Sequence, residues 1–144
     1  MKTILAIALS LALLIFSGIT LAGSEDIWGI WITTEQPKGD SLHVSQKRVF
    51  SPDGMVKFYR YESSQSPEFE GTYTIAEKWT DSEGNIWYKM KATGKSIRYG
   101  DNAGWYLLAR ISDSGKTLEY VYHPVDYHKK LDPNHPSYRI IYRQ

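Results

Sequence analysis

The chain has 144 residues and no cysteine, and its 17 lysines and arginines against 16 acidic residues give a formal net charge of +1. This length allows one hydrophobic core and is too short for two ordinary domains. The absence of cysteine excludes a disulfide framework and thiolate chemistry, and the balanced charge provides no strong field for attracting nucleic acid or anionic lipid. We therefore expect a single domain with no nucleic-acid partner.

Residues 1–22 have the order of segments found in a secretory signal peptide. A basic start is followed by a run over residues 4–16 that is apolar except for one serine, and small residues follow up to Ala22. The apolar run is shorter than the ~18 residues that a membrane-spanning helix usually needs. We expect the leader to be removed, leaving residues 23–144 as the mature domain of a secreted or periplasmic protein without a membrane anchor.

Eight runs of the mature chain have the composition of β-strands, since they are rich in aromatic and β-branched residues and are bounded by polar or glycine-containing turns. The clearest alternation of side chains is in residues 69–79 and 86–93, which form a predicted antiparallel hairpin. The expected strands are residues 27–33, 42–50, 55–61, 69–79, 86–93, 104–111, 117–122 and 138–143.

Three glycines carry local predictions. Gly29 lies inside the first expected strand, where glycine usually marks a sharp bend or a close packing contact. Gly54 and Gly115 end two short polar segments that are typical of tight hairpin turns. The connections are therefore those of a meander.

Eight short antiparallel strands at this spacing predict either an up-and-down barrel or a sandwich. We expect the barrel, because closure removes the exposed edges that an open meander of this length would leave. The predicted fold class is therefore an all-β, eight-stranded antiparallel up-and-down barrel.

The first strand contains Gly29-Ile30-Trp31, which resembles the G-x-W signature of the lipocalin-like (calycin) superfamily. The resemblance implies that the tryptophan packs across the closed end of the barrel, under a basic side chain from the last strand. Arg139 and Arg143 are the two candidates for that partner. The resemblance also implies a small hydrophobic ligand inside the barrel.

The alternation also predicts which side chains face the barrel interior. The lining would be apolar with several phenol hydroxyls, which suits an amphipathic or planar ligand. An eight-stranded barrel can equally be filled by its own side chains. We expect a small hydrophobic or amphipathic ligand to contact Trp31, Tyr73, Tyr88, Leu107 and Tyr120. The full predicted lining is Trp31, Tyr73, Ile75, Tyr88, Met90, Trp105, Leu107, Ala109, Leu118, Tyr120 and Tyr122, joined by Tyr138, Ile140 and Tyr142.

One arginine is a candidate ligand anchor. Arg60 shares the parity of Val56 and Phe58, so it enters the barrel if those side chains point inward, and Glu77 is then its candidate partner. The opposite face of residues 55–61 is equally allowed by the sequence. In that case Arg60 is a surface residue.

Three histidines, His123, His128 and His135, lie in a proline-containing loop at spacings of five and seven. These spacings match no standard zinc template, so we expect a solvated loop, no metal site and no cofactor. The chain also has neither the nucleophile-elbow motif nor the phosphate-binding loop, and we expect no enzyme.

Three hypotheses of function follow, in order of preference. The first is an exported lipocalin-like protein that binds a small molecule inside the barrel. The second is a filled barrel that acts through its surface on an unidentified protein partner, with residues 123–136 or the outward rings of Trp87 and Tyr106 as the contact. The third is a barrel enzyme, which requires titratable side chains converging in a cleft.

Overall fold

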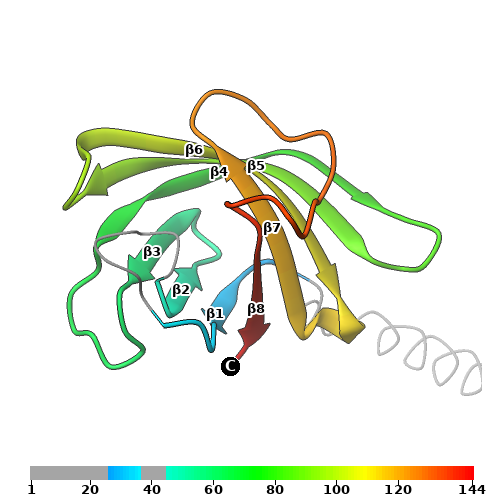
Figure 1. Ribbon diagram of the computed structural model, residues 1–144, viewed down its shortest axis with the longest axis horizontal. Coiled ribbons are helices and arrows are strands. Elements are labelled where there is room, and N and C mark those ends of the chain that lie inside the picture. Colours follow the sequence, from blue (N-terminus) through cyan, green and yellow to red (C-terminus); the bar gives the residue numbers. More distant parts are fainter. Residues whose placement is uncertain (1–25, 37–44) are drawn as a thin grey trace, which may run out of the picture.

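The computed structural model describes residues 26–36 and 45–144, and these form a closed antiparallel barrel (Figure 1). Each strand pairs with the next one in sequence, and the last strand pairs with the first. The predicted all-β up-and-down barrel is confirmed. The strands are β1 (Gly29–Ile32), β2 (Lys47–Phe50), β3 (Met55–Tyr59), β4 (Phe69–Thr80), β5 (Ile86–Ser96), β6 (Gly100–Ser112), β7 (Thr117–His123) and β8 (Arg139–Arg143), with one short 3-10 turn, η2 (Asp113–Gly115), before β7.

The barrel is uneven, because its strands differ in length. β4, β5 and β6 are long and curved, and their connecting hairpins project on opposite sides of the molecule (Figure 1). The short strands β1, β2, β3 and β8 complete the closure. The long connection from β7 to β8 arches over the outside of the sheet (Figure 1).

Inward side chains of all eight strands form one aromatic-rich core. Most of the predicted lining belongs to it, because strict alternation places every second residue on the inner face. The buried members of that prediction are Trp31, Tyr73, Tyr88, Met90, Leu107, Ala109, Leu118 and Tyr120, while Trp105 and Tyr122 are partly buried and pack against them.

The predicted burial of Ile75 and the predicted inward position of Tyr142 are wrong. Ile75 is paired with Met90 and shares its face, but it is 44% exposed, because β3 pairs with β4 only as far as Thr72. In β8 the opposite parity faces the core, since Ile141 is buried opposite Leu118 while Tyr142 is exposed. Tyr138 and Ile140 are only partly buried, so neither joins the core.

The structure settles the orientation of β3. Val56 and Phe58 point inward and are buried, but the strand ends at Tyr59, before Arg60. The predicted pairing of Arg60 with Glu77 is wrong. Arg60 pairs with Glu68 at 3.3 Å, since Glu68 lies in the connection that returns to β4, and Glu77 instead pairs across the β4–β5 hairpin with Lys89 at 3.0 Å.

One end of the barrel is closed by Trp31 and Arg143. The Arg143 guanidinium lies 4.3 Å from the centre of the Trp31 ring and donates hydrogen bonds to the carbonyl oxygens of Trp28 at 2.6 Å and Gly115 at 2.7 Å. The indole Nε1 of Trp31 donates to the Ile27 carbonyl oxygen at 2.7 Å. These contacts tie the first strand, the last strand and the β6–β7 turn together. Arg143, rather than Arg139, is therefore the basic side chain over Trp31.

Gly29 is both bent and closely packed, as predicted. Its φ is +128°, a region that disfavours side chains, and a Cβ at this position would lie 3.0 Å from Nη1 of Arg143. The glycine therefore lets the arginine reach the backbone of β1.

Two facing glycines let β4 and β5 approach closely. Gly71 and Gly94 are directly paired, and a Cβ on Gly94 would collide with the carbonyl oxygen of Glu70 and the Cα of Gly71. Both obstacles are backbone atoms, so no side chain can move away to make room. The pair marks a place where the sheet needs glycine for close backbone contact.

We expect Gly94→Ala to lower the free energy of unfolding by about 3 kcal/mol or more, at the upper end of overpacking costs. Urea unfolding followed by tryptophan fluorescence measures this loss. Gly104→Ala is the matched control on β6, because its nearest obstacles are the Thr93 methyl at 3.2 Å and the Ala92 carbonyl oxygen at 3.3 Å. A loss at Gly94 no larger than at Gly104 would contradict the steric account.

The predicted leader, residues 1–22, lies outside the described residues. Within the described ranges, no helix has the length and apolar character needed to cross a membrane.

Candidate ligand-binding site

The barrel interior contains a buried arginine, Arg48, which is the direct cross-strand partner of Trp31 on β1. It shares the inward face of β2 with Phe50 and is paired with Phe58 of β3. Only 4% of Arg48 is exposed. Its guanidinium carbon lies 5.0 Å from the centre of the Phe58 ring and 4.7 Å from the centre of the Tyr120 ring. A cation is thus held between two aromatic faces inside the barrel.

The pKa of Arg48 is lowered from 12.5 to about 9, chiefly by burial and then by the positive charge of Arg139. The charges of Tyr122 and Glu35 act in the opposite direction. Because the lowered pKa is still above neutrality, Arg48 carries its charge at pH 7. The site around Arg48 therefore holds two positive charges, although Glu35 pairs with Arg139 at 3.4 Å.

Two tyrosines of β7 add hydroxyl groups to this site. Tyr120 is 3% exposed, and its hydroxyl has no hydrogen-bond partner in the described part of the chain. Burial raises the pKa of Tyr122 to about 12, while the nearby charges of Arg139 and Arg48 lower it. The Tyr122 hydroxyl therefore remains protonated at neutral pH, and the phenol groups of both residues can donate hydrogen bonds.

A hollow of about 420 Å³ opens beside this cluster. Its walls come from the β5–β6 hairpin, from the start of β6 and from the end of β7, and its size falls in the range of small-molecule sites. Trp105 in the wall lies 6.5 Å from Phe58, ring centre to ring centre, and Phe58 lies under Arg48. The hollow is lined by Tyr99, Asn102, Ala103, Gly104, Trp105, Tyr122 and Pro124.

The structure places all five predicted ligand residues in the core. Tyr120 contacts Arg48, and Trp31 is the cross-strand partner of Arg48, whereas the other three pack among core side chains. None of the larger hollows lined by described residues is bordered by any of the five. Their contact with a ligand stays a prediction. These five residues are Trp31, Tyr73, Tyr88, Leu107 and Tyr120.

Sequence reasoning missed Arg48 and considered Arg60 instead. The run over residues 42–50 alternates poorly, so its inward face was not assigned. A signal was nevertheless present, because Arg48 is two residues before Phe50 and so shares its face. Assigning Phe50 to the core would have carried Arg48 inward with it.

The three loop histidines do come together. The ring centres of His123 and His128 are 5.7 Å apart, and those of His128 and His135 are 4.5 Å apart. Their nitrogens serve the loop itself, since Nδ1 of His123 accepts the Val125 backbone N–H at 3.1 Å. In residues 26–36 and 45–144, no group of three or more histidine or acidic side chains is arranged to hold a metal ion.

Comparison with known proteins adds no relative. No family model, curated protein or solved structure matches this chain. The account of function below therefore rests on the residues of the chain itself.

Proposed function

We propose that this protein is an exported, lipocalin-like binding protein that holds a small amphipathic molecule carrying an anionic group beside Arg48. One observation carries the proposal: Arg48 is buried between the rings of Phe58 and Tyr120, next to the second positive charge of Arg139. Two like charges in a buried site repel each other, and an anion between them would relieve that repulsion.

The rest of the site gives the ligand its other properties. The hollow beside Trp105 and Tyr122 offers aromatic faces to an apolar body, and the Tyr120 hydroxyl offers a hydrogen bond that no described residue accepts. A small molecule with an apolar part and a carboxylate, sulfonate or sulfate group would contact both the aromatic faces and the positive charges of the site. An uncharged apolar molecule would not relieve the repulsion between Arg48 and Arg139.

Three further features support an exported carrier of this class. The contact of Arg143 with Trp31 has the form that the lipocalin-like resemblance implies. The order of segments in residues 1–22 is that of a secretory leader. The barrel has eight strands, the size at which an interior can hold one small ligand.

The proposal is for binding rather than catalysis. Two titratable groups of the site have strongly shifted pKa values, Arg48 at about 9 and Tyr122 at about 12. General acid–base catalysts work best when their pKa is close to the working pH. Both groups are better suited to holding an anion than to exchanging protons at pH 7.

A matched pair of fluorescent probes tests the proposal. We expect 1-anilinonaphthalene-8-sulfonate to bind the mature protein about ten-fold or more tightly than N-phenyl-1-naphthylamine, which has the same ring system without the sulfonate. A charge-assisted hydrogen bond contributes about 1.5–3 kcal/mol, and each 1.4 kcal/mol is a factor of ten in affinity. Fluorescence titration gives both dissociation constants.

The two probes separate the parts of the proposal. Binding of the neutral probe alone would keep the barrel as a carrier but remove its preference for anions. If neither probe binds, and native mass spectrometry of gently purified protein shows only the bare chain, the binding function itself is wrong.

A further inference from the structure

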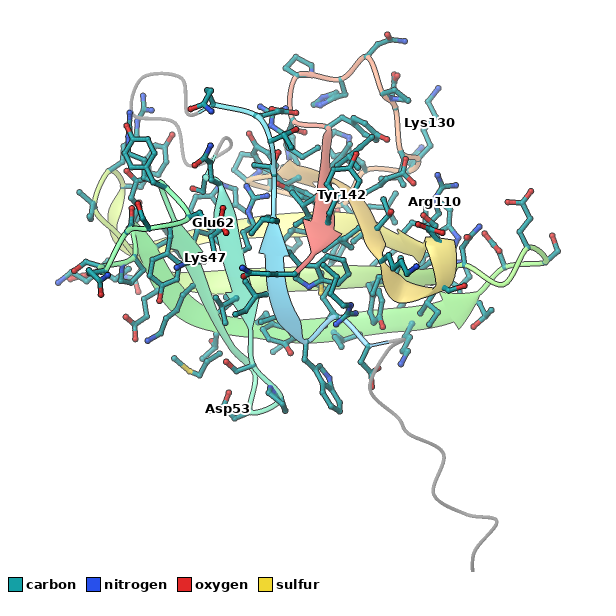
Figure 2. The ribbon with its side chains drawn as sticks, turned by 90° about the horizontal axis from the view of Figure 1, so that it is seen from below. Lys47, Asp53, Glu62, Arg110, Lys130 and Tyr142 are labelled. Atoms are coloured by element: carbon teal, nitrogen blue, oxygen red, sulfur yellow. The ribbon has the colours of Figure 1, made fainter. Side chains whose placement is uncertain are left out.

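A hollow of about 830 Å³ lies outside the barrel, between the outer face of β4–β7 and the β7–β8 connection. Its floor includes the buried side chain of Leu108, and Arg110 stands on the sheet beside it. Lys130 borders it from the connection (Figure 2). We call this hollow the outer groove.

A row of side chains crosses the sheet along the outer groove. Trp79, Trp87, Arg110 and Glu119 are successive cross-strand partners on β4, β5, β6 and β7. The indoles of Trp79 and Trp87 are stacked, with ring centres 5.8 Å apart and planes 8° from parallel. Arg110 lies 5.3 Å from the centre of the Trp87 ring and donates from Nε to Glu119 at 2.9 Å.

Trp79 ends this row and remains 39% exposed. One face of its ring stacks on Trp87, and β3 pairs with β4 only as far as Thr72, so no neighbouring strand covers the other face. Trp87 Nε1 donates to Asp81 at 2.8 Å, whereas Trp79 Nε1 has no hydrogen-bond partner among the described residues. An exposed tryptophan with a free ring face and a free donor is typical of a binding site rather than of core packing.

The charges around the groove restrict the ligand. Glu77 pairs with Lys89 and Glu119 pairs with Arg110, so both acids already have partners. A charged group of a ligand lying on the sheet side of the groove would have to break these pairs. A purely apolar ligand would remove them from water without replacing their hydrogen bonds, which is costly. The groove therefore favours a neutral ligand with many hydroxyl groups and one apolar face.

We propose that the outer groove binds a saccharide, with a sugar ring lying on the exposed face of Trp79. The C–H face of a pyranose suits an indole ring, and its vicinal hydroxyls suit carboxylate and guanidinium groups that accept or donate two parallel hydrogen bonds. Lys129 and Lys130, which have no acidic partner within ion-pair distance in the described part of the chain, provide donors from the opposite wall. This site is separate from the site around Arg48 inside the barrel and does not depend on the function proposed there.

The test uses four defined probes: cellotetraose, maltotetraose, N-acetylated chitotetraose and adenosine monophosphate. We expect at least one tetrasaccharide to show saturation-transfer NMR signals and a dissociation constant of about 1 mM or lower, and Trp79→Ala to weaken its binding about ten-fold or more. Tyr61→Ala is the matched control, since Tyr61 is similarly exposed but lies far from the groove in sequence and borders a different hollow. It should leave the affinity unchanged.

The proposal is wrong if no tetrasaccharide binds at about 10 mM, a concentration that detects even a millimolar complex. It is also wrong if Trp79→Ala does not weaken tetrasaccharide binding. Tighter binding of adenosine monophosphate than of any tetrasaccharide would instead identify the groove as a base-stacking site. If Trp79→Ala fails to fold by circular dichroism, the double variant Lys129→Ala/Lys130→Ala replaces it. Both lysines are exposed, and their loss is expected to weaken saccharide binding several-fold without affecting the fold.

Discussion

Replacing Trp31 with alanine is expected to lower the free energy of unfolding by about 3–5 kcal/mol, as for other buried tryptophans. Trp31 is fully buried, so the change leaves a large cavity at the closed end. It also removes the ring under the Arg143 guanidinium and the donor to the Ile27 carbonyl oxygen. Urea unfolding monitored by far-ultraviolet circular dichroism measures the loss.

The neighbouring residue provides the control. Ile30 is on the same strand but points outward and is 40% exposed, so Ile30→Ala should change stability by only about 0.5 kcal/mol. Similar losses for the two variants would mean that Trp31 does not hold the closed end. Arg143→Leu should approach the effect of Trp31→Ala, because it leaves the carbonyl oxygens of Trp28 and Gly115 without their donor.

Replacing Arg48 with methionine is expected to have opposite effects on stability and on binding. The barrel should become more stable by about 1–4 kcal/mol at neutral pH, as when other buried charged groups are replaced by apolar side chains of similar volume. Binding of 1-anilinonaphthalene-8-sulfonate should weaken about ten-fold or more, while binding of N-phenyl-1-naphthylamine stays the same. Arg48→Lys keeps the charge and should retain part of the preference for the anion.

The pH dependence follows from the lowered pKa of Arg48. In the folded protein this pKa is about 9, below the unfolded value of 12.5, so between these values the unfolded chain holds more protons and stability rises with pH. The cost of the buried charge is therefore fully present below about pH 9 and declines above it. The stability advantage of Arg48→Met over the native protein should shrink between about pH 9 and about pH 11.

Urea unfolding of both proteins across this pH range measures the difference in their stability. The tyrosines with raised pKa values are present in both proteins, so their titration does not account for that difference. If the free energies of unfolding of the two proteins change in parallel with pH, the buried charge of Arg48 does not destabilise the folded protein. If Arg48→Met is less stable than the native protein at neutral pH, Arg48 stabilises the barrel and is not kept there to bind a ligand.

Strand number, order and most inward faces could be predicted from the sequence, because alternation and turn residues are local signals. The exposure of Ile75 could not be predicted, since it depends on where β3 stops pairing with β4 and leaves no mark in the composition. Tyr142 was misplaced for another reason. The last strand has apolar residues on both parities, and only its pairing of Arg143 with Trp31 selects the face that turns inward.

The site was less predictable than the fold. Arg48 is brought to Tyr120 across the barrel, 72 positions along the chain, and such a contact appears only once closure is known. The outer groove likewise joins the row from Trp79 to Glu119 with a loop that folds back over it. By contrast, the contact of Arg143 with Trp31 was anticipated to within two candidates by the resemblance to the lipocalin-like superfamily.

The bonds from Arg143 to the backbone of Asp26 and Trp28 span 117 and 115 positions of the chain. Forming contacts of such long sequence separation first costs the entropy of closing a long loop, and proteins dominated by such contacts fold slowly. During synthesis, the barrel therefore cannot close until β8 has left the ribosome and can pair with β1. Until then, both strands present unpaired edges, and this interval is when the chain is most exposed to self-association.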